Sequence, residues 1–411
     1  MSDLLCRFCG TFLEHTFVDL GMSPLANGFL ARNQLQEREV FYPLHTYVCS
    51  NCFLVQLEEF ETPEQIFSDY AYFSSYSQSW LDHARQYVDM MIERFQLNAA
   101  KQVIEIASND GYLLQYFRQK EIPVLGIEPA ANVAEVAVNK GIPTEVTFFG
   151  TATAEQIAGK GKKADLLLGN NVLAHVPDIN DFVAGMKIVL QPDGIITMEF
   201  PHLLQLIRQN QFDTIYHEHF SYLSLSTARS IFTHHKLMIF DVEELPSHGG
   251  SLRIFACHAA NEKFSVSASV EEMLQLERSE GMRQVDTYKL FENKVHHIKR
   301  SLLSFFIEAK NQGKTIVGYG AAAKGNTLLN YCGIRRDFID YVADRNPHKQ
   351  GMYLPGTHIP VSGPEKIVET RPDYLFILPW NLRDEVISQM SCIRKWGGRF
   401  VLPIPALEIV E

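Results

Sequence analysis

Four short apolar segments between residues 101 and 200 each end in a polar or small-residue turn, and this repeat constrains the fold more than any other feature. The first covers 101–106 and breaks into Ala-Ser-Asn-Asp-Gly, after which a helical pattern begins. The others cover 124–128, 165–171 and 194–200. Strands that alternate with helices form a mostly parallel sheet, which binds ligands at the carboxyl ends of its strands. The sequence therefore predicts an α/β protein with a central Rossmann-like sheet.

Length and composition limit the classes of protein to consider. At roughly 150 residues per domain, 411 residues predict about three domains. A chain that is 46% hydrophobic and 21% charged is globular rather than disordered or fibrous. The net charge of −11 argues against binding to nucleic acid. Because there is no secretory pattern at the start and no apolar run of about 20 residues, we expect a cytoplasmic protein that does not enter membranes.

Two Cys-x-x-Cys motifs, Cys6 to Cys9 and Cys49 to Cys52, predict a metal site. This spacing lets two thiolates from a tight turn reach one tetrahedral zinc ion, and two such motifs complete a four-sulfur set. A closed set favours structural rather than catalytic zinc. Reduced cysteines in hairpin turns, or a redox pair, are the alternatives. The long gap between the motifs predicts a turn-rich insertion.

The turn after the first strand and the acid after the second strand predict a cofactor site. A carboxylate at the end of the second strand is placed to accept hydrogen bonds from two ribose hydroxyls. The turn lacks the full G-x-G-x-x-G of a dinucleotide site, and with an acid inside the first strand it resembles the pattern of S-adenosylmethionine (SAM) methyltransferases. A Rossmann domain for another nucleotide remains the alternative. The expected SAM contacts in these strands and turns are Glu105, Ala107, Asn109, Gly111, Glu128, Pro129, Asn170 and Asn171.

An aromatic passage over 70–77 interleaves tyrosines with serines. Such runs are usually part of a core, but buried hydroxyls need partners, so a ligand-facing role has equal support. We expect Tyr72 and Ser75 to contact the cofactor and Tyr76 to contact the substrate.

The segment 213–222, Asp-Thr-Ile-Tyr-His-Glu-His-Phe-Ser-Tyr, is the best candidate for acid–base chemistry, because histidine titrates near neutral pH and a carboxylate can orient it. In an extended conformation His217 and His219 lie on the face opposite Glu218. In a helical one, His219 shares a face with Tyr216 and Glu218 leaves it, and Tyr216 or His175 becomes the alternative candidate for the base. A metal site built on the two histidines, and histidines held only by backbone, are the alternatives.

The C-terminal part begins with a helical pattern over 269–312, which we expect to bridge two domains. The next segment, 315–326, reads as strand, small-residue turn and helix start, and with Lys324 it suits a pyrophosphate. Asp344 stands where a dinucleotide's ribose acid would, so an NAD site is an alternative. We expect His348 and Lys349 to lie on a solvated face.

Several motifs in order resemble one family over essentially the whole chain. They are the paired Cys-x-x-Cys motifs, Tyr-Phe-Ser-Ser-Tyr-Ser-x-Ser-Trp over 72–80, Glu-Ile-Ala-Ser-Asn-Asp-Gly over 105–111, Tyr-His-Glu-His-Phe-Ser-Tyr over 216–222 and His-Gly-Gly-Ser-Leu-Arg over 248–253. The chain is similar to the nucleotide-sugar C-methyltransferases of deoxysugar pathways, which methylate the carbon next to a 4-keto group.

This resemblance implies three parts: a zinc-binding domain (1–68), a class I SAM methyltransferase domain (69–262) and a Rossmann-like sugar-nucleotide domain (263–411). It implies SAM and structural zinc as cofactors, and a thymidine-linked 4-keto-6-deoxysugar as substrate, with C-3 favoured over C-5. We expect a monomer. An NAD-dependent enzyme, a methyltransferase for a non-sugar small molecule, a zinc-ribbon RNA or protein methyltransferase and a non-enzymatic binding module are the alternatives.

The implied mechanism removes a proton next to the ketone and leaves an enolate that attacks the sulfonium methyl. His219 is the expected base, and Glu218 is expected to orient or charge it. Donors to the ketone or enolate are expected to be Tyr216, Tyr76 and His175. The residues expected to bind the rest of the substrate are Tyr222, His248, Arg253, Gly320, Lys324 and Asn326.

Overall fold

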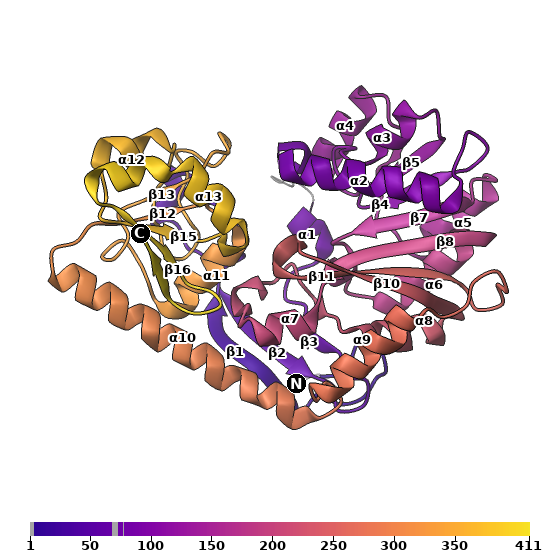
Figure 1. The fold of residues 1–411 in the computed structure, drawn as a ribbon, viewed down its shortest axis with the longest axis horizontal. Coiled ribbons are helices and arrows are strands. Elements are labelled where there is room, and N and C mark those ends of the chain that lie inside the picture. The colour runs from indigo at the N-terminus through magenta and orange to yellow at the C-terminus, as the bar shows by residue number, and fades with distance from the viewer. Residues whose placement is uncertain (1–3, 68–72, 77) are drawn as a thin grey trace.

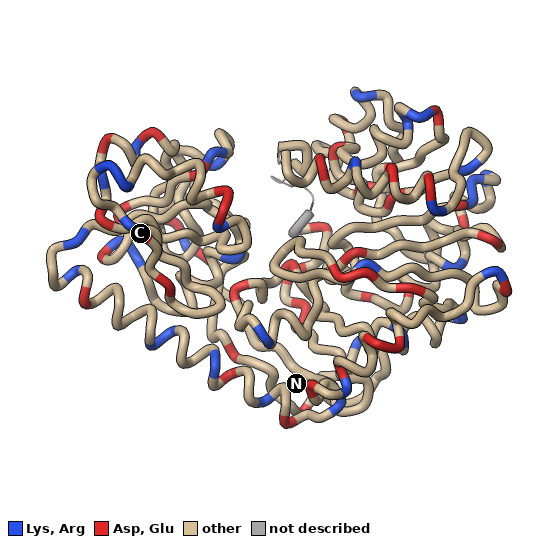
Figure 2. Tube along the Cα trace, viewed as in Figure 1, with Lys and Arg blue, Asp and Glu red and all other residues tan. Residues whose placement is uncertain are grey.

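The computed structural model describes residues 4–67, 73–76 and 78–411 and arranges them around three sheets (Figure 1). The predicted α/β class, with a central Rossmann-like sheet and a second α/β part after it, is confirmed. No helix within these described ranges has the length and apolar character needed to cross a membrane. Lys and Arg are mixed with Asp and Glu along the whole traced chain (Figure 2).

The N-terminal segment forms an antiparallel sheet in the order β1-β2-β3-β9. Its strands are β1 (His15–Ser23), β2 (Tyr42–Val48), β3 (Val55–Leu57) and β9 (Ser221–Tyr222). β9 comes from much later in the chain and pairs with β3 through Val55 and Tyr222. The turn-rich insertion holds β1, β2 and the short 3-10 helix η1 (Arg32–Gln36), and α1 (Pro63–Phe67) follows the sheet.

The central sheet has seven strands in the order β10-β11-β8-β7-β4-β5-β6, and only β11 is antiparallel to its neighbours. The strands are β4 (Val103–Ile106), β5 (Val124–Ile127), β6 (Thr144–Glu145), β7 (Ala164–Asn170), β8 (Leu190–Pro201), β10 (Leu237–Leu245) and β11 (Ser251–His258). All four strands predicted from the apolar segments are present. The helices are α2 (Gln78–Phe95), α3 (Leu114–Gln119), α4 (Ala131–Asn139), α5 (Thr151–Gly159), α6 (Ile179–Val189), α7 (Leu203–Arg208) and α8 (Leu225–His234), with 3-10 turns η2 (Ser74–Tyr76), η3 (Leu173–His175), η4 (Phe212–Thr214) and η5 (Ser247–Gly249).

Helices cover both faces of this sheet. Tyr87 of α2 and Phe117 of α3 belong to one apolar core, and Phe182 of α6 belongs to another. The neighbouring β4 residues Val103 and Ile104 fall into different cores, as alternation along a strand requires. The result is a three-layer α/β/α domain whose polar strand ends meet at one edge.

The C-terminal sheet has six strands in the order β14-β13-β12-β15-β16-β17, all parallel except β17. The strands are β12 (Ile316–Tyr319), β13 (Val342–Ala343), β14 (Val361–Ser362), β15 (Tyr374–Ile377), β16 (Arg399–Leu402) and β17 (Glu408–Val410). The helices are α11 (Ala323–Cys332), α12 (Glu365–Thr370) and α13 (Arg383–Gln389), with 3-10 turns η6 (Trp380–Leu382) and η7 (Ser391–Trp396).

The helical stretch predicted over 269–312 is two helices, α9 (Ala268–Ser279) and α10 (Val285–Asn311). Gly281, with φ of 76°, ends α9 because the left-handed conformation cannot continue a helix. α10 runs beneath the C-terminal lobe and lies along β1 (Figure 1), where Phe291 stacks on Phe17 at 4.6 Å between ring centroids. The N-terminal sheet and the C-terminal lobe therefore share one core.

Candidate functional site

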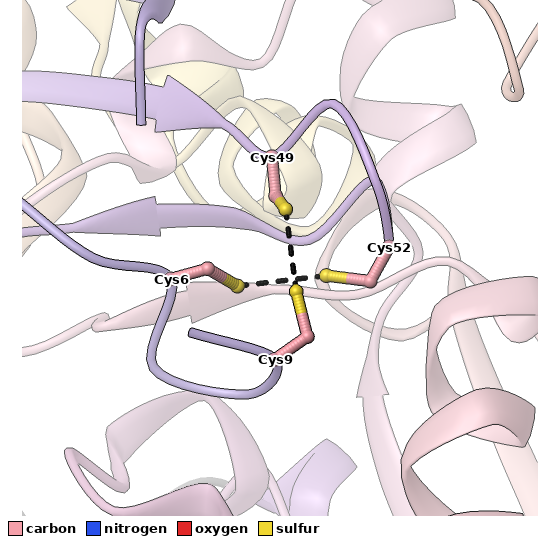
Figure 3. A group of neighbouring side chains, drawn as sticks. All are labelled: Cys6, Cys9, Cys49 and Cys52. Carbon is pink, nitrogen blue, oxygen red and sulfur yellow. Dashed lines mark hydrogen bonds between the residues drawn. The ribbon is translucent and has the colours of Figure 1, made fainter. Parts of the chain in front are cut away.

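The four cysteines converge on one point, as predicted (Figure 3). Their sulfur atoms all lie within 4.8 Å of one another, and the Cys6–Cys52 and Cys9–Cys49 pairs are 3.5 Å apart. Tetrahedral zinc with Zn–S bonds of about 2.3 Å spaces its sulfurs about 3.8 Å apart, so the four thiolates fit this ion. Among the residues that the structure describes, no histidine or carboxylate joins the group. The closed four-sulfur set indicates structural zinc.

The turn after β4 adopts an unusual backbone, with three residues in the left-handed region. Ala107, Asn109 and Gly111 have φ angles of 55°, 49° and 74°. A Cβ at Gly111 would lie 2.3 Å from Cδ1 of Ile142, so only glycine fits there. The amide of Ser74 donates to Oδ1 of Asn109 at 2.9 Å, which ties the aromatic passage to this turn.

Glu105 inside β4 lacks the partner that a buried carboxyl normally has. Neither of its oxygens is hydrogen-bonded by any residue in the described ranges, and the side chain is buried. Burial, together with nearby Glu128 and Asp110, raises the pKa of Glu105 well above its ordinary value. Buried polar groups without partners in a protein generally mark a missing ligand. The carboxyl and the open turn fit SAM, whose sulfonium and ammonium groups carry positive charge.

Glu128 shapes the same turn. Its Oε2 accepts from the amide of Asn109 and its Oε1 from the amide of Ala130, both at 2.9 Å. Burial raises the pKa of Glu128, although these two amides oppose the rise. A carboxylate accepts about four hydrogen bonds, so capacity for ribose hydroxyls remains. Pro129 follows directly, before α4 begins.

The end of β7 meets the same edge of the sheet. Nδ2 of Asn170 lies 3.5 Å from the Tyr112 hydroxyl, and Nδ2 of Asn171 lies 3.1 Å from Nε2 of His248. The His248 ring packs edge-on against Trp80 at 5.4 Å, and burial lowers its pKa to about 4. The expected SAM-contacting asparagines and the expected substrate-binding His248 are therefore neighbours.

The aromatic passage is held near the cofactor turn. Lys140 donates to the Ser75 hydroxyl at 3.0 Å and to the carbonyl of Asp110 at 2.9 Å. Tyr76 is 65% exposed, and its ring lies 6.4 Å from that of His348 in the C-terminal lobe. The other expected contact, Tyr72, lies outside the described residues.

The segment 213–222 forms a turn rather than an extended strand. The amide of His219 donates to the carbonyl of Tyr216 at 2.9 Å, and their rings share a face with centroids 4.0 Å apart. Glu218 leaves that face, where Asn27 donates to its Oε1 at 2.7 Å. The segment as a whole is neither extended nor helical, since it passes from η4 through a turn at 217–218 into β9, but the turn places these side chains as the helical alternative does.

The ring of His219 is held in a defined tautomer. Its Nδ1 lies 2.8 Å from the carbonyl oxygen of Thr214. Because a carbonyl only accepts, Nδ1 carries the proton and Nε2 has a lone pair. No residue in the described part of the chain hydrogen-bonds Nε2. Burial, with the neighbouring His175, lowers the pKa of His219 well below its ordinary value, so the ring is neutral at neutral pH.

The expected role of Glu218 in orienting His219 is wrong. The Thr214 carbonyl orients the ring, and Glu218 instead faces Asn27 from the N-terminal segment and the charge of Lys349 from the C-terminal lobe. Burial raises the pKa of Glu218 to about 7. Glu218 thus links the loop to two other parts of the chain.

His217 lies on another side of the loop from His219. Its Nε2 lies 3.2 Å from the carbonyl of Pro43, and its ring packs against Tyr42 at 5.8 Å. Within the described ranges the only metal-binding group is the four-cysteine cluster. The alternative of a metal held by the two histidines is therefore not supported.

His175 and Tyr222 complete an aromatic cluster around His219. The His175 ring lies 4.7 Å from that of His219, nearly perpendicular at 71°, and the Tyr222 ring lies 6.1 Å away. Burial lowers the pKa of His175 to about 4 and raises that of the Tyr222 hydroxyl. The amide of Phe220 donates to the carbonyl of Ala174 at 2.8 Å, which joins the two histidine-bearing segments.

The C-terminal lobe contributes Lys324 to this cluster. Its Nζ donates to Oδ1 of Asn381 at 2.8 Å and lies 4.7 Å from the ring centre of Trp380. Nε1 of Trp380 donates to Oδ2 of Asp213, next to the loop, at 2.7 Å. Burial lowers the pKa of Lys324, although Asp213 opposes this. The ammonium therefore lies beside the histidine loop.

Two other expected substrate residues have structural contacts, and one of them joins the C-terminal lobe to the N-terminal segment. Nδ2 of Asn326 donates to the carbonyl of Ala26 at 2.6 Å. Gly320 is required where it stands, because a Cβ would lie 2.5 Å from Cδ of Pro379. Gly320 lies in the turn before α11, and Asn326 lies near the start of that helix. This is the position expected to face a diphosphate.

Asp344 holds the backbone of the same turn. Its Oδ2 accepts from the amide of Ala321 and its Oδ1 from the amide of Asn346, both at 2.7 Å. Like Glu128, Asp344 keeps acceptor capacity beyond these two amides, so this geometry does not decide the NAD alternative. Lys349 donates to the carbonyl of Ala321 at 2.7 Å and packs 5.1 Å from the ring centre of Phe29, so its expected place on a solvated face is wrong.

The structure places Arg253 inside the methyltransferase sheet rather than free for substrate, contrary to expectation. Its Nη2 donates to Oε2 of Glu199 at 2.8 Å and its Nη1 to Glu243 at 3.2 Å. The guanidinium also lies 4.7 Å from the ring centre of Tyr87. The fold tolerates the burial of this charged guanidinium because the two carboxylates balance its charge.

Sequence reasoning gave no role to Thr214, Asn27 or Trp380, which hold the histidine loop. Their partners lie far along the chain or are backbone carbonyls, so no local pattern marks them. Asp213 belongs to the segment 213–222 but received no role of its own. Its burial and its hydrogen bond to Trp380 cannot be recognised from the sequence.

The fold and these sites define a zinc-binding, SAM-dependent methyltransferase. Three family models match in order: "Putative zinc binding domain" over 6–67, "Methyltransferase domain" over 80–238 and "C-methyltransferase C-terminal domain" over 246–405. The chain is 37% identical over 406 residues to C-methyltransferase NovU of Streptomyces niveus, which covers 99% of this chain and 96% of the relative. The chain belongs to this C-methyltransferase family, which confirms the resemblance found in the motifs.

Other similarities are confined to part of the chain. The ubiquinone biosynthesis O-methyltransferase of Bartonella bacilliformis is 27% identical over 24% of this chain and 40% of its own length. The SAM-bound crystal structure of magnesium protoporphyrin IX methyltransferase (ChlM) from Synechocystis PCC 6803 matches with a TM-score of 0.34 and 13% identity, over 43% of this chain and 79% of that one. The PH0226 protein of Pyrococcus horikoshii OT3 matches with a TM-score of 0.38 and 13% identity, over 48% and 99%.

Proposed function

We propose that the protein methylates the carbon next to the ketone of a nucleotide-linked 4-keto-6-deoxysugar. The motif resemblance favours C-3 over C-5 and a thymidine diphosphate carrier, and we propose that the enzyme acts as a monomer. The observation that carries the proposal is the neutral His219, whose Nδ1 proton faces the Thr214 carbonyl and whose Nε2 has no partner among the described residues. Such a nitrogen is suited to remove a carbon-bound proton.

The proton transfer leaves an enolate and an imidazolium. In our proposal Nε2 of His219 takes the proton from the carbon next to the ketone, the electrons of the broken C–H bond form the C=C bond of the enolate, and the π electrons of the carbonyl move to its oxygen. The Thr214 carbonyl then accepts from the cationic ring, which stabilises it. The depressed pKa of His219 makes this base weak, so the reaction depends on stabilisation of the enolate.

Groups around His219 are candidates to stabilise the enolate oxygen. Tyr216 and His175 pack directly against the base, and Tyr76 lies on the exposed side of the aromatic passage. Lys324 adds a positive charge from the opposite lobe, and among the described residues its Nζ hydrogen-bonds only Asn381. Preorganised donors of this kind act most strongly where charge develops in the transition state.

The cofactor and the sugar carrier occupy separate edges in this proposal. SAM, held at the strand ends by Glu105, Glu128 and the 107–111 turn, supplies an electrophilic methyl group. The carrier's diphosphate lies at the N-terminus of α11, where helix amides favour anions. Tyr222, beside His219, and His248, beside Asn171, are proposed to contact the sugar.

Deuterium exchange tests the enolate chemistry directly. The protein, with and without SAM, is incubated in heavy water with a thymidine-linked 4-keto-6-deoxysugar, and the ring protons are followed by NMR. Exchange or methylation at one ring carbon, abolished in His219→Asn, supports the proposal and identifies the carbon. If SAM binds but no ring carbon exchanges or is methylated, this substrate is wrong, and the alternative of a non-sugar acceptor is favoured.

A further inference from the structure

Arg7 stands inside the first zinc knuckle, between Cys6 and Cys9, and reaches two other segments of the chain. Its Nη1 donates to the carbonyl of Pro177 at 2.9 Å, and its Nη2 donates to the carbonyl of Leu57. An arginine guanidinium carries its positive charge at neutral pH. Both bonds are therefore charge-assisted, the stronger class of hydrogen bond.

One carbonyl belongs to the segment that carries His175, and the other belongs to β3, which is hydrogen-bonded to the segment that carries His219. Pro177 follows His175 by two residues. Leu57 ends β3, and its amide donates to the carbonyl of Phe220, directly after His219, at 3.0 Å. The Arg7 guanidinium also lies 5.5 Å from the ring centre of Phe220. One side chain thus contacts the backbone two residues after His175 directly, and reaches the residue after His219 through its ring and through the Leu57–Phe220 hydrogen bond.

The knuckle itself is fixed from several directions. The Arg7 amide donates to Oε1 of Gln56 at 2.9 Å, and Nε2 of Gln56 donates to Sγ of Cys6 at 3.3 Å. Gln56 pairs with Ser221 across β3 and β9. Nδ2 of Asn180 donates to the carbonyl of Arg7 at 3.2 Å. Once the four thiolates hold zinc, the backbone of Arg7 is locked relative to β9.

We propose that Arg7 is a positioning residue that couples the zinc knuckle to the spacing of His175 and His219; this inference rests on the function proposed for His219. The zinc ion then acts on the reaction indirectly, because it fixes the backbone from which Arg7 reaches Pro177 and Leu57. Small misplacement of a reacting group, on the order of 1 Å, lowers rates by about a hundredfold. In this proposal Arg7 therefore keeps His219 at the position that proton transfer requires.

The test compares zinc-loaded wild-type protein with Arg7→Met, which removes both donors, and Arg7→Lys, which keeps the charge. Arg32→Met, an exposed arginine in η1 of the N-terminal segment, is the matched control. Zinc content, the Kd for SAM and the local protection of amides from hydrogen exchange are measured without substrate. The kcat is then measured with a thymidine-linked 4-keto-6-deoxysugar.

In Arg7→Met we expect one zinc per chain, an unchanged Kd for SAM, and faster amide exchange, by about tenfold or more, confined to 55–57, 174–177 and 216–222. The kcat should fall about 10- to 100-fold, which is the range typical of residues that orient active-site groups without touching the substrate. Arg7→Lys should recover part of both losses, and Arg32→Met should change neither.

Unchanged exchange in these segments would overturn the coupling. Faster exchange that extends equally to β4 and β12 would show a general loss of stability, and would also overturn it. Local loosening with an unchanged kcat would refute the positioning role. Failure of the proposed function is distinguishable, because wild-type protein would then not methylate the sugar while the exchange measurements would still report the coupling.

Discussion

Substitution of Arg253 by methionine should destabilise the protein by several kcal/mol without weakening substrate binding. Glu199 is fully buried, and Oε2 accepts from Arg253 and from His83, while Oε1 accepts from Ser247. Burial alone would raise the pKa of Glu199, but the His83 hydrogen bond and the charge of Arg253 outweigh it and lower the pKa from 4.5 to about 2. At 1.36 kcal/mol per pH unit, this depression corresponds to about 3 kcal/mol of folding stability at neutral pH.

The sign follows from the direction of that pKa. A carboxyl whose pKa is lower in the folded state stabilises the protein above its unfolded pKa, and this contribution is lost as pH falls from about 4.5 towards 2. Arg253→Met leaves a buried carboxylate without its cation, which typically costs about 3–5 kcal/mol. The pKa of Glu199 then rises, so the acid-induced loss of stability moves to higher pH.

Urea unfolding at pH 7, followed by circular dichroism, measures the loss. The double variant Arg253→Met/Glu199→Gln is the control, since it removes the buried charge together with its partner and should unfold at higher urea than Arg253→Met alone. A loss below about 1 kcal/mol in Arg253→Met, or a raised KM for the sugar with unchanged stability, would refute this reasoning and return Arg253 to the substrate site.

Four further results are expected. His219→Asn should lower kcat by about 100- to 10,000-fold with an unchanged Kd for SAM, whereas His217→Asn, facing the N-terminal sheet, should not; equal losses would contradict the assignment of the base. Because the pKa of His219 is well below 6.5, kcat/KM should show no inflection near that pH once Glu218→Gln removes the neighbouring carboxyl, whose pKa is about 7; an inflection that remains in this variant would disprove the depression. Glu105→Gln should weaken SAM binding about tenfold in calorimetry while the ligand-free protein keeps or gains thermal stability, since an unpartnered buried acid is removed; tighter binding would contradict its cofactor role. Cys49→Ser should abolish zinc binding in metal analysis and lower the Tm, and full zinc retention would contradict the four-sulfur site.

The parts of the fold that the sequence predicted depend on neighbouring residues. The strand ending at Ile106 and its turn to Gly111 are marked by an apolar run followed by small residues. The cysteine knuckles are marked by spacing alone, and the structure brings their sulfurs together. Such signals lie within a few positions, so a single sequence contains them.

The parts that sequence reasoning missed depend on contacts between distant segments. Glu218 stands beside His219 in the chain, which suggested that one orients the other, but a one-residue step in a turn points the two side chains apart. The partner of Glu218 is Asn27, far earlier in the chain. Arg253 belonged to a family motif, yet only its burial beside Glu199 distinguishes an interior ion pair from a ligand contact.

The histidine loop has little regular structure of its own, so its conformation must come from its surroundings. β9 pairs with the N-terminal β3, the carbonyl of Ile215 accepts from Thr327 of α11 at 3.0 Å, and Asp213 accepts from Trp380. Each of these contacts comes from a part of the chain outside the central sheet. The central domain contains strand ends that suit SAM, but the geometry of His219 also requires the N-terminal and C-terminal parts. A change at any of these three contacts should therefore lower the rate of proton abstraction more than it weakens cofactor binding.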